Sequence, residues 1–211
     1  MKIVITAGPT REHLDPVRFL SNPSTGKMGF AIAAAAARKG HDVTLVAGPV
    51  ALKTPKGVKR IDVISAREML EAVVNVLNDA PEQKTVFIST AAVADWRPAE
   101  CATSKLKKHQ MSGTLKLVRN PDILKTVTGC LKVGFAAETD NVLAEASRKC
   151  REKGLSFIVA NDVTEKGSGF GTDTNRVTFV YPDGTLRRHP LMTKRRVAGA
   201  ILASISKLAS D

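Results

Sequence analysis

The sequence predicts an α/β protein with a Rossmann-like, doubly wound and mainly parallel sheet, to which a basic flap and a late β-hairpin are added. Two observations carry this prediction. Short apolar segments alternate with helical patterns, and 211 residues suffice to bury a core. Strands that alternate with helices form βαβ units, whose right-handed crossovers cover both faces of a parallel sheet. We therefore expect a single domain over residues 1–211.

The first half of the chain alternates between the two kinds of element. In chain order we expect a strand at 3–7, a helix at 28–39 closed by Gly40, a strand at 43–47, a short strand at 63–64, a helix at 66–77 and a strand at 86–89. The helix at 66–77 has its apolar residues at helical spacing, which predicts one buried face.

The second half repeats this pattern and then changes it. A strand at 132–136, a helix that runs to Lys153 and a strand at 157–160 extend the parallel sheet. Residues 167–171 read as a flexible turn. Residues 177–181 and the Pro-Asp-Gly turn at 182–184 predict the late hairpin. An amphipathic helix at 194–208 closes the chain.

The middle of the chain has no helical or strand face over 98–113. It carries the basic run Lys-Leu-Lys-Lys-His at 105–109, and residues 115–118 then alternate like an exposed strand. Such a segment beside a nucleotide-binding fold is either a mobile lid over phosphates or a solvated surface loop. The residues alone leave both possibilities open.

The overall charge is strongly basic. The formal net charge is +12, whereas the hydrophobic share of 43% and the charged share of 25% are ordinary for a globular protein. One Trp and one Tyr offer few stacking platforms for single-stranded nucleic acid, and the basic residues are spread along the chain. Polyanionic small molecules explain the charge equally well. We therefore expect no nucleic acid as a partner.

The three cysteines, Cys101, Cys130 and Cys150, have neither the spacing of a zinc site nor that of a disulfide framework. Cys101 could be a nucleophile only if the fold supplied a base, so we expect ordinary thiols in a reducing compartment. No leader pattern or apolar stretch long enough to cross a bilayer is evident, which predicts a soluble, cytoplasmic protein without a membrane partner.

The most informative segment is Ser-Asn-Pro-Ser-Thr-Gly-Lys-Met-Gly at 21–29, which lies directly before an alanine-rich helix. Uncovered N–H groups at a helix N-terminus attract anions, so this loop predicts a phosphate or carboxylate site. It is not a P-loop, because Met28 follows Gly26-Lys27, and Gly8-Pro9-Thr10 is not a dinucleotide fingerprint. An NAD(P) oxidoreductase thus loses its main support but stays an alternative, as does a nucleic-acid-binding module.

Two lysines, Lys149 and Lys153, are four residues apart and share one face near the end of their helix. The helix dipole alone favours positive charge there. Two ammonium groups on one face can also hold a triphosphate.

The order of seven motifs resembles that of bacterial phosphopantothenoylcysteine synthetases, the synthetase half of a bifunctional coenzyme A biosynthesis protein. These motifs are AGPT at 7–10, DPVRF at 15–19, SNPSTGKMG at 21–29, AAVAD at 91–95, NPD at 120–122, GFAAET at 134–139 and ANDV at 160–163. The resemblance implies a CTP-dependent ligase that joins 4′-phosphopantothenate to L-cysteine through an acyl-cytidylate, with Mg²⁺ on the triphosphate. It also implies a homodimer with partner-completed sites. Members commonly carry a flavin-dependent decarboxylase domain, so this chain is either an excised domain or a free-standing synthetase.

The resemblance also assigns site residues. Asn22 and Lys105 take catalytic roles: the Asn22 amide would bond the acyl oxygen, unless it only forms an Asx turn, and Lys105 belongs to a flap at about 96–114. Asp95 would bind ribose hydroxyls or lie near the metal, whose ligands stay unassigned. The implied substrate-binding residues are Arg18, Asn22, Ser24, Gly26, Lys27 and Met28. The implied nucleotide-binding residues are Ala91, Asp95, Lys105, Pro121, Asp122, Ile123, Leu124, Phe135, Lys149 and Lys153.

Overall fold

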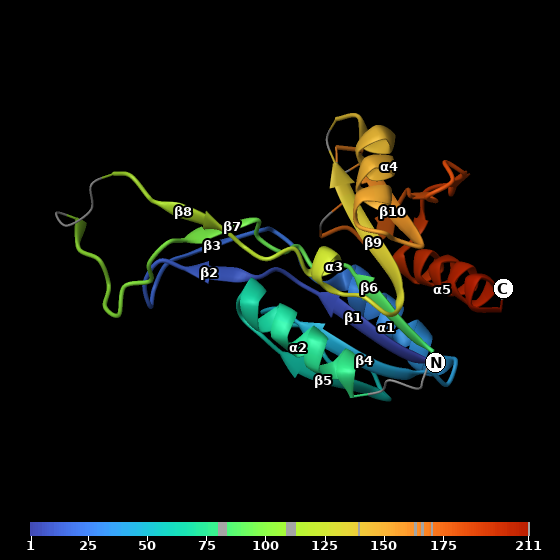
Figure 1. Ribbon diagram of the computed structural model, residues 1–211, viewed down its shortest axis with the longest axis horizontal. Coiled ribbons are helices and arrows are strands. Elements are labelled where there is room, and N and C mark those ends of the chain that lie inside the picture. The colour runs from blue at the N-terminus through green and yellow to red at the C-terminus, as the bar shows by residue number, and fades with distance from the viewer. Residues whose placement is uncertain are drawn as a thin grey trace.

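The computed structural model of the chain has an eight-stranded central sheet in the order β13-β12-β10-β9-β6-β1-β4-β5 (Figure 1). It describes residues 1–79, 84–108, 113–138, 140–162, 164–165, 167–169 and 171–210. The strands are β1 (Lys2–Ala7), β4 (Asp42–Ala47), β5 (Val58–Asp62), β6 (Thr85–Ser89), β9 (Leu131–Glu138), β10 (Phe157–Asp162), β12 (Thr178–Val180) and β13 (Leu186–Arg188). Six neighbouring strands, from β10 to β5, pair in parallel, whereas β12 pairs antiparallel with both β10 and β13. The predicted fold class is confirmed.

Helices cover both faces of this sheet. They are α1 (Lys27–Arg38), α2 (Ala66–Asn78), α3 (Ile123–Thr126), α4 (Val142–Glu152) and α5 (Lys194–Ser210). Side chains of β1 alternate between two cores: Ile3 and Ile5 pack with α1 and α5, whereas Val4 packs with α2, α3 and α4. A strand buried on both faces needs apolar residues at every position, which explains the continuous apolar run at 3–7. Within the described residues, no helix is long and apolar enough to span a membrane.

The prediction of a strand at 63–64 was wrong. The strand that pairs with β4 at this edge of the sheet is β5, which ends at Asp62 and carries Lys59 and Arg60. An edge strand is tolerant of charged residues, because one of its sides has no neighbouring strand to exclude water. The apolar pair at 63–64 follows β5, where Val63 packs into the core near α2.

Four short strands form an arm that extends away from the sheet (Figure 1). They are β2 (Arg11–His13), β3 (Phe19–Ser21), β7 (Trp96–Pro98) and β8 (Leu117–Arg119), paired as β2–β3 and β7–β8. The sequence predicted an exposed strand at 115–118 but not the β2–β3 hairpin. The predicted flap lies between β7 and β8, and its residues 109–112 lie outside the described residues, as do the motif residues Thr139 and Val163 and the turn residue Phe170. A smaller pair, β11 (Thr174–Asn175) and β14 (Met192–Thr193), precedes α5.

The hairpin side of the core contains a histidine that should make stability depend on pH. The ring of His189 lies 4.5 Å from that of Phe179, and its Nε2 atom has no hydrogen-bond partner within the described chain. Burial and the charge of Arg187 lower the pKa of His189. His189 therefore takes up a proton more readily in the unfolded chain than in the folded chain. The stability that neutral His189 contributes is present above about pH 6.5, and it is lost as the pH falls toward the pKa of His189 in the folded state.

Replacing His189 by Phe should flatten this part of the pH dependence. The check is the free energy of unfolding in urea at about pH 7.5 and about pH 5.5. The difference between the two should be smaller in His189→Phe than in the natural chain. Some slope should stay, because the pKa of His41 is also lowered by burial and by nearby positive charge. An unchanged slope would show that His189 protonates equally well in both states.

Candidate active site

A cleft of about 660 Å³ opens at the carboxyl ends of the central parallel strands. Its described lining includes residues directly after β6, the end of β9, Asn161 of β10 and the start of α1. The sheet order reverses between β1 and β6, since chain order runs outward on either side of that point. Crevices at such reversal points are where open α/β sheets bind ligands.

The N-terminus of α1 forms one wall of the cleft. Gly26 precedes the helix with φ of 76°, and no side chain caps the helix or adds an acidic group to its first turn. A Cβ at Gly29 would lie 2.5 Å from Ala7 Cβ and 2.5 Å from Thr90 Oγ1, so only glycine allows the helix this close to the strand ends. The first N–H groups of α1 are thereby left available to an anion in the cleft, as the loop at 21–29 predicted.

Asn22 lies at the edge of the same wall and reaches across the cleft. Its Nδ2 atom donates to the carbonyl oxygens of Ala92, at 3.2 Å, and Val93, at 3.3 Å. Within the described residues its Oδ1 atom accepts no hydrogen bond, so the Asx turn that the sequence raised as the alternative is not formed there. Donation to a substrate oxygen would require Asn22 to release one of these carbonyls, whereas its Oδ1 atom is already available as an acceptor.

The strand-end segment at 91–95 is held by Asn120. Its backbone N–H donates to the carbonyl of Asp95 at 2.8 Å, and its Nδ2 donates to the carbonyl of Ala94 at 2.8 Å. These bonds join the two predicted nucleotide-lining loops. The Asp95 carboxylate is exposed and has no partner within the described chain.

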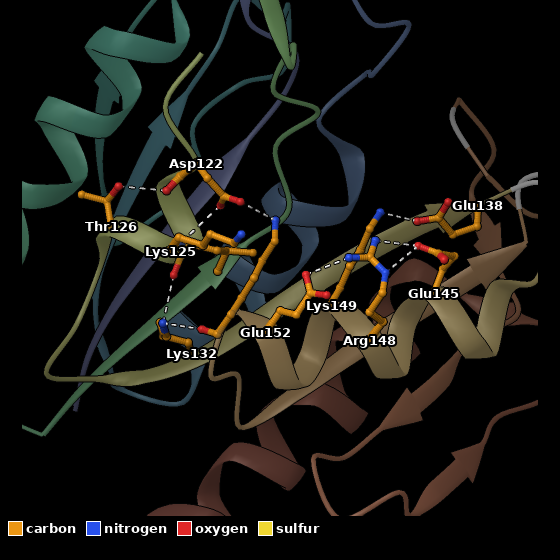
Figure 2. A network of polar contacts seen from close by, with 11 residues as sticks. Asp122, Lys125, Thr126, Lys132, Glu138, Glu145, Arg148, Lys149 and Glu152 are labelled. Carbon is orange, nitrogen blue, oxygen red and sulfur yellow. Dashed lines mark hydrogen bonds and ion pairs between the residues drawn. The ribbon is translucent and has the colours of Figure 1, made fainter. Parts of the chain in front are cut away.

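The opposite wall is built from α3 and the last turn of α4 (Figure 2). Lys153 forms an ion pair with Asp122 at 3.0 Å, and Lys149 forms one with Glu138 at 2.5 Å. Asp122 also caps α3 by accepting from Lys125 N. Both lysines line the cleft, yet each already has a carboxylate partner, which the sequence did not reveal.

A glycine-rich segment closes the end of the cleft beside α1. Lys194 is buried and donates to the carbonyls of Gly169 and Thr172. Lys27 donates to the Gly171 carbonyl at 2.9 Å and to the Asp173 carboxylate at 2.8 Å. Burial and the charge of Lys27 lower the pKa of Lys194, and Lys27 lowers that of Asp173. The cleft thus gathers positive charge beside the open end of α1.

Several lining residues were not predicted. Asn120 and Asn161 lie in motifs that were recognised without assigning these two residues a role, whereas nothing in the sequence marks Arg119, Asn175 or Lys194. The predicted residues that line the cleft are Asn22, Ser24, Gly26, Lys27, Met28, Ala91, Asp95, Pro121, Asp122, Ile123, Leu124, Phe135, Lys149 and Lys153.

Two predicted site residues, Arg18 and Lys105, do not line this cleft. Arg18 forms a two-point ion pair with the buried Asp15 and donates to the Leu106 carbonyl at 3.0 Å. The Asp15 carboxylate in turn accepts from Leu106 N at 3.2 Å, and Arg18 holds the pKa of Asp15 well below its usual range. Arg18 therefore anchors the base of the flap to the β2–β3 hairpin on the arm.

The cleft offers little to a resident metal ion. Within the described residues, no group of three or more His, Cys, Asp or Glu side chains could hold one. The carboxylates of the described lining are Asp95 and Asp122, and the second is engaged by Lys153. Mg²⁺ in nucleotide enzymes is commonly held by one or two carboxylates together with substrate phosphates. This donor set fits a Mg²⁺ ion that arrives with a polyphosphate.

The fold and the cleft define an α/β protein in which an uncapped helix N-terminus opens onto the cleft at the strand ends. Residues 1–208 match the model of the DNA/pantothenate metabolism flavoprotein C-terminal domain. The chain therefore belongs to this family, and the resemblance found in the sequence is confirmed.

Similar proteins agree with this assignment. The coenzyme A biosynthesis bifunctional protein CoaBC of Escherichia coli (strain K12) is 52% identical over 192 residues, covering 87% of this chain and 46% of that protein. CoaBC of Bacillus subtilis (strain 168) is 49% identical over 214 residues, covering 99% and 52%. A crystal structure of the C-terminal domain of CoaBC matches with a TM-score of 0.82 and 46% identity, covering 100% of this chain and 98% of that one. The chain spans about half the length of the curated relatives it matches.

Proposed function

We propose that this chain is a phosphopantothenate–cysteine ligase that uses CTP. The observation that carries the proposal is the cleft itself, where the uncapped start of α1 faces Lys149 and Lys153 across the carboxyl ends of the sheet. The relatives that are 52% and 49% identical in sequence are named for coenzyme A biosynthesis, which agrees with this activity. Neither the nucleic-acid nor the oxidoreductase alternative gains a comparable observation.

The proposed reaction has two steps. A carboxylate oxygen of 4′-phosphopantothenate attacks the α-phosphorus of CTP, and the bond to the β-phosphate oxygen breaks to release pyrophosphate. The amine of L-cysteine then attacks the acyl carbon of the resulting acyl-cytidylate. The amine loses a proton, the acyl–oxygen bond breaks, and CMP leaves with 4′-phosphopantothenoylcysteine as the product.

The main physical task of the first step is to bring two anions together. The N–H groups of α1 and the ammonium groups of Lys27, Lys149 and Lys153 would offset the charge of the triphosphate. Positioning of both substrates would supply much of the remaining acceleration. Mg²⁺ carried by the triphosphate would favour pyrophosphate as the leaving group. Of the two carboxylates in the described lining, Asp95 is the one that no lysine engages, so it would contact this ion.

The base and sugar would occupy the wall formed by the loops that Asn120 joins. Ala91, Pro121 and Phe135 give this wall an apolar character. The amide groups around it can form hydrogen bonds with the polar groups of a base or sugar. The choice of CTP over ATP rests on the family resemblance, so the nucleotide is the first variable in the test below.

The arm supports a homodimer. It exposes apolar side chains that a monomer would leave in water: Val17 at 56%, Phe19 at 39%, Trp96 at 45%, Leu115 at 41% and Leu117 at 40%. Exposed apolar patches commonly mark interaction sites. Because the arm also carries Arg18 and Lys105, a second copy that docks on it would bring these two residues toward the partner's cleft.

The proposal also includes a partner domain and a cellular compartment. The relatives are bifunctional, so a flavin-dependent decarboxylase is the partner that we expect to be fused to or associated with this chain. The cysteines are free thiols, with Cys101 exposed, which fits a reducing, cytoplasmic compartment.

The test is pyrophosphate release from 4′-phosphopantothenate and Mg²⁺ with either CTP or ATP, with and without L-cysteine. We expect release with CTP, and phosphopantothenoylcysteine only when cysteine is present. Activity with ATP alone would keep the ligase and overturn the choice of nucleotide. No release with either nucleotide would contradict the ligase, and DNA and NAD(P) binding would then be measured.

Changing Lys149 and Lys153 together to Ala should weaken CTP binding about tenfold or more and CMP binding much less, since only CTP presents the distal phosphates to both ammonium groups. Isothermal titration with each nucleotide measures both losses. Arg148→Ala is the matched control, because Arg148 lies on the same helix and its ion pairs within the described residues are with Glu145 and Glu152. Equal losses for CTP and CMP would show that the two lysines serve the helix and not the phosphates.

A further inference from the structure

Lys132 joins the two elements that form the α3–α4 wall of the cleft (Figure 2). It lies near the start of β9, beneath this wall, and is partly buried. Its Nζ atom donates to the carbonyl of Leu124 at 2.9 Å and to the carbonyl of Lys153 at 2.6 Å. One ammonium group thus binds the short helix α3 and the end of α4 at the same time.

Both accepting carbonyls lie where a helix leaves such groups unsatisfied. Leu124 belongs to the four-residue helix α3, and Lys153 is the C-cap residue of α4. The last carbonyls of a helix have no partner within the helix, and a cation there is also favoured by the dipole. The side chain of Lys132 therefore satisfies two carbonyls that otherwise have to be hydrated or left unpaired.

Within the part of the chain that the structure describes, few other polar bonds join α3 to α4. Lys153 pairs with Asp122 at 3.0 Å, but the side chains of this pair are 22% and 36% exposed. Ion pairs that water can reach contribute little to stability. Below them, Gly134 of β9 leaves room for Leu155 and Leu124, since a Cβ there would lie 2.7 Å from Leu155 Cδ1. Among the described residues, Lys132 is the charged side chain that bonds the backbone of both elements.

We propose that Lys132 is a positioning residue that sets the separation of α3 and α4 and thereby aims the Lys153 ammonium group into the cleft. Lys132 itself is not part of the described cleft lining. It acts through the Lys153 backbone and through the loop that carries Pro121 and Asp122. This inference rests on the proposed function, because it assigns Lys132 to the binding of the nucleoside triphosphate.

Lys2 supplies a matched control. It is a buried lysine on β1 of the same sheet, and its Nζ atom donates at 2.6 Å to the carbonyl of Val76 near the end of α2. The bond has the same chemistry as those of Lys132, but Lys2 and α2 do not line the cleft. A purely structural role for Lys132 predicts that the two lysines behave alike.

The experiment compares Lys132→Met and Lys2→Met in the pyrophosphate-release assay, together with CTP and CMP titrations of each folded variant. We expect Lys132→Met to raise the KM for CTP about tenfold, with a smaller change in kcat and in CMP affinity. Lys2→Met should lower the melting temperature while its KM stays at the natural value. Lys132→Arg, which keeps the donors, should recover part of the lost CTP affinity.

The outcomes separate the two proposals. A natural chain that makes no product contradicts the ligase. A natural chain that makes product, together with a Lys132→Met variant that keeps the natural KM for CTP, overturns the positioning role alone. Equal loss of CTP and CMP affinity in Lys132→Met also overturns it. If Lys132→Met does not fold, Lys132→Gln, which loses the charge and the reach to both carbonyls, decides. A KM for CTP that rises while the melting temperature stays natural supports the positioning role, and an unchanged KM overturns it.

Discussion

Replacing Lys105 by Gln is expected to lower pyrophosphate release by about 10²-fold or more while the fold stays intact. Lys105 lies on the flap and is exposed, so its loss removes charge and little packing. The amide of Gln is polar and of similar length but cannot offset a phosphate charge. The check is single-turnover pyrophosphate release, with circular dichroism to verify folding. Near-natural release would reduce this segment to a surface loop, the alternative that the sequence left open.

The position of Lys105 also bears on how the two copies of the proposed homodimer share their clefts. Because Lys105 does not line the cleft of its own chain, we propose that it acts in the cleft of the partner. Mixed dimers of Lys105→Gln with an Asn22 variant would then contain one site with both defects and one site with none. Random mixing should restore about a quarter of the natural activity in such a symmetric dimer. No recovery would show that each flap serves its own cleft.

The fold could be predicted because its signals are local. The strands at 3–7, 43–47 and 157–160 are continuous apolar runs, and such runs separated by amphipathic helices leave a parallel sheet as the simple solution. The β5 edge strand was misplaced for the converse reason. Three of its five residues, Lys59, Arg60 and Asp62, are charged and carry no core signal, so the apolar pair that follows it attracted the assignment.

The site could be predicted only in part, because sequence motifs report which residues gather but not what each one bonds. The loop at 21–29 was expected to present a helix N-terminus, and the open end of α1 agrees with that expectation. The Glu138 and Asp122 partners of the two lysines arise from packing between elements 11 and 31 residues apart in sequence. Lys132 and Lys194 likewise bind backbone carbonyls, which leave no trace in a motif.

Replacing Asn22 by Asp is expected to separate the two chemical steps. Pyrophosphate release should continue at a similar rate, whereas formation of phosphopantothenoylcysteine should fall by about 10²-fold or more and acyl-cytidylate should accumulate. The reason is that an amide N–H can stabilise charge on the acyl oxygen during attack by the amine, and a carboxylate cannot. Quenched-flow separation of acyl-cytidylate, CMP and product measures both steps. Asn78→Asp, on the exposed end of α2, controls for the added charge.

The structure sharpens this expectation. The Asn22 amide now donates to the carbonyls of Ala92 and Val93, so Asp at this position would place a carboxylate against two carbonyl oxygens. That repulsion should move the side chain away from the segment at 91–95, which is why Asn22→Ser is a useful second variant without added charge. If Asn22→Ser also accumulates acyl-cytidylate, the missing amide donor is the cause. If both variants stop pyrophosphate release instead, Asn22 is needed to shape the cleft before the first step, and its proposed role in the second step is wrong.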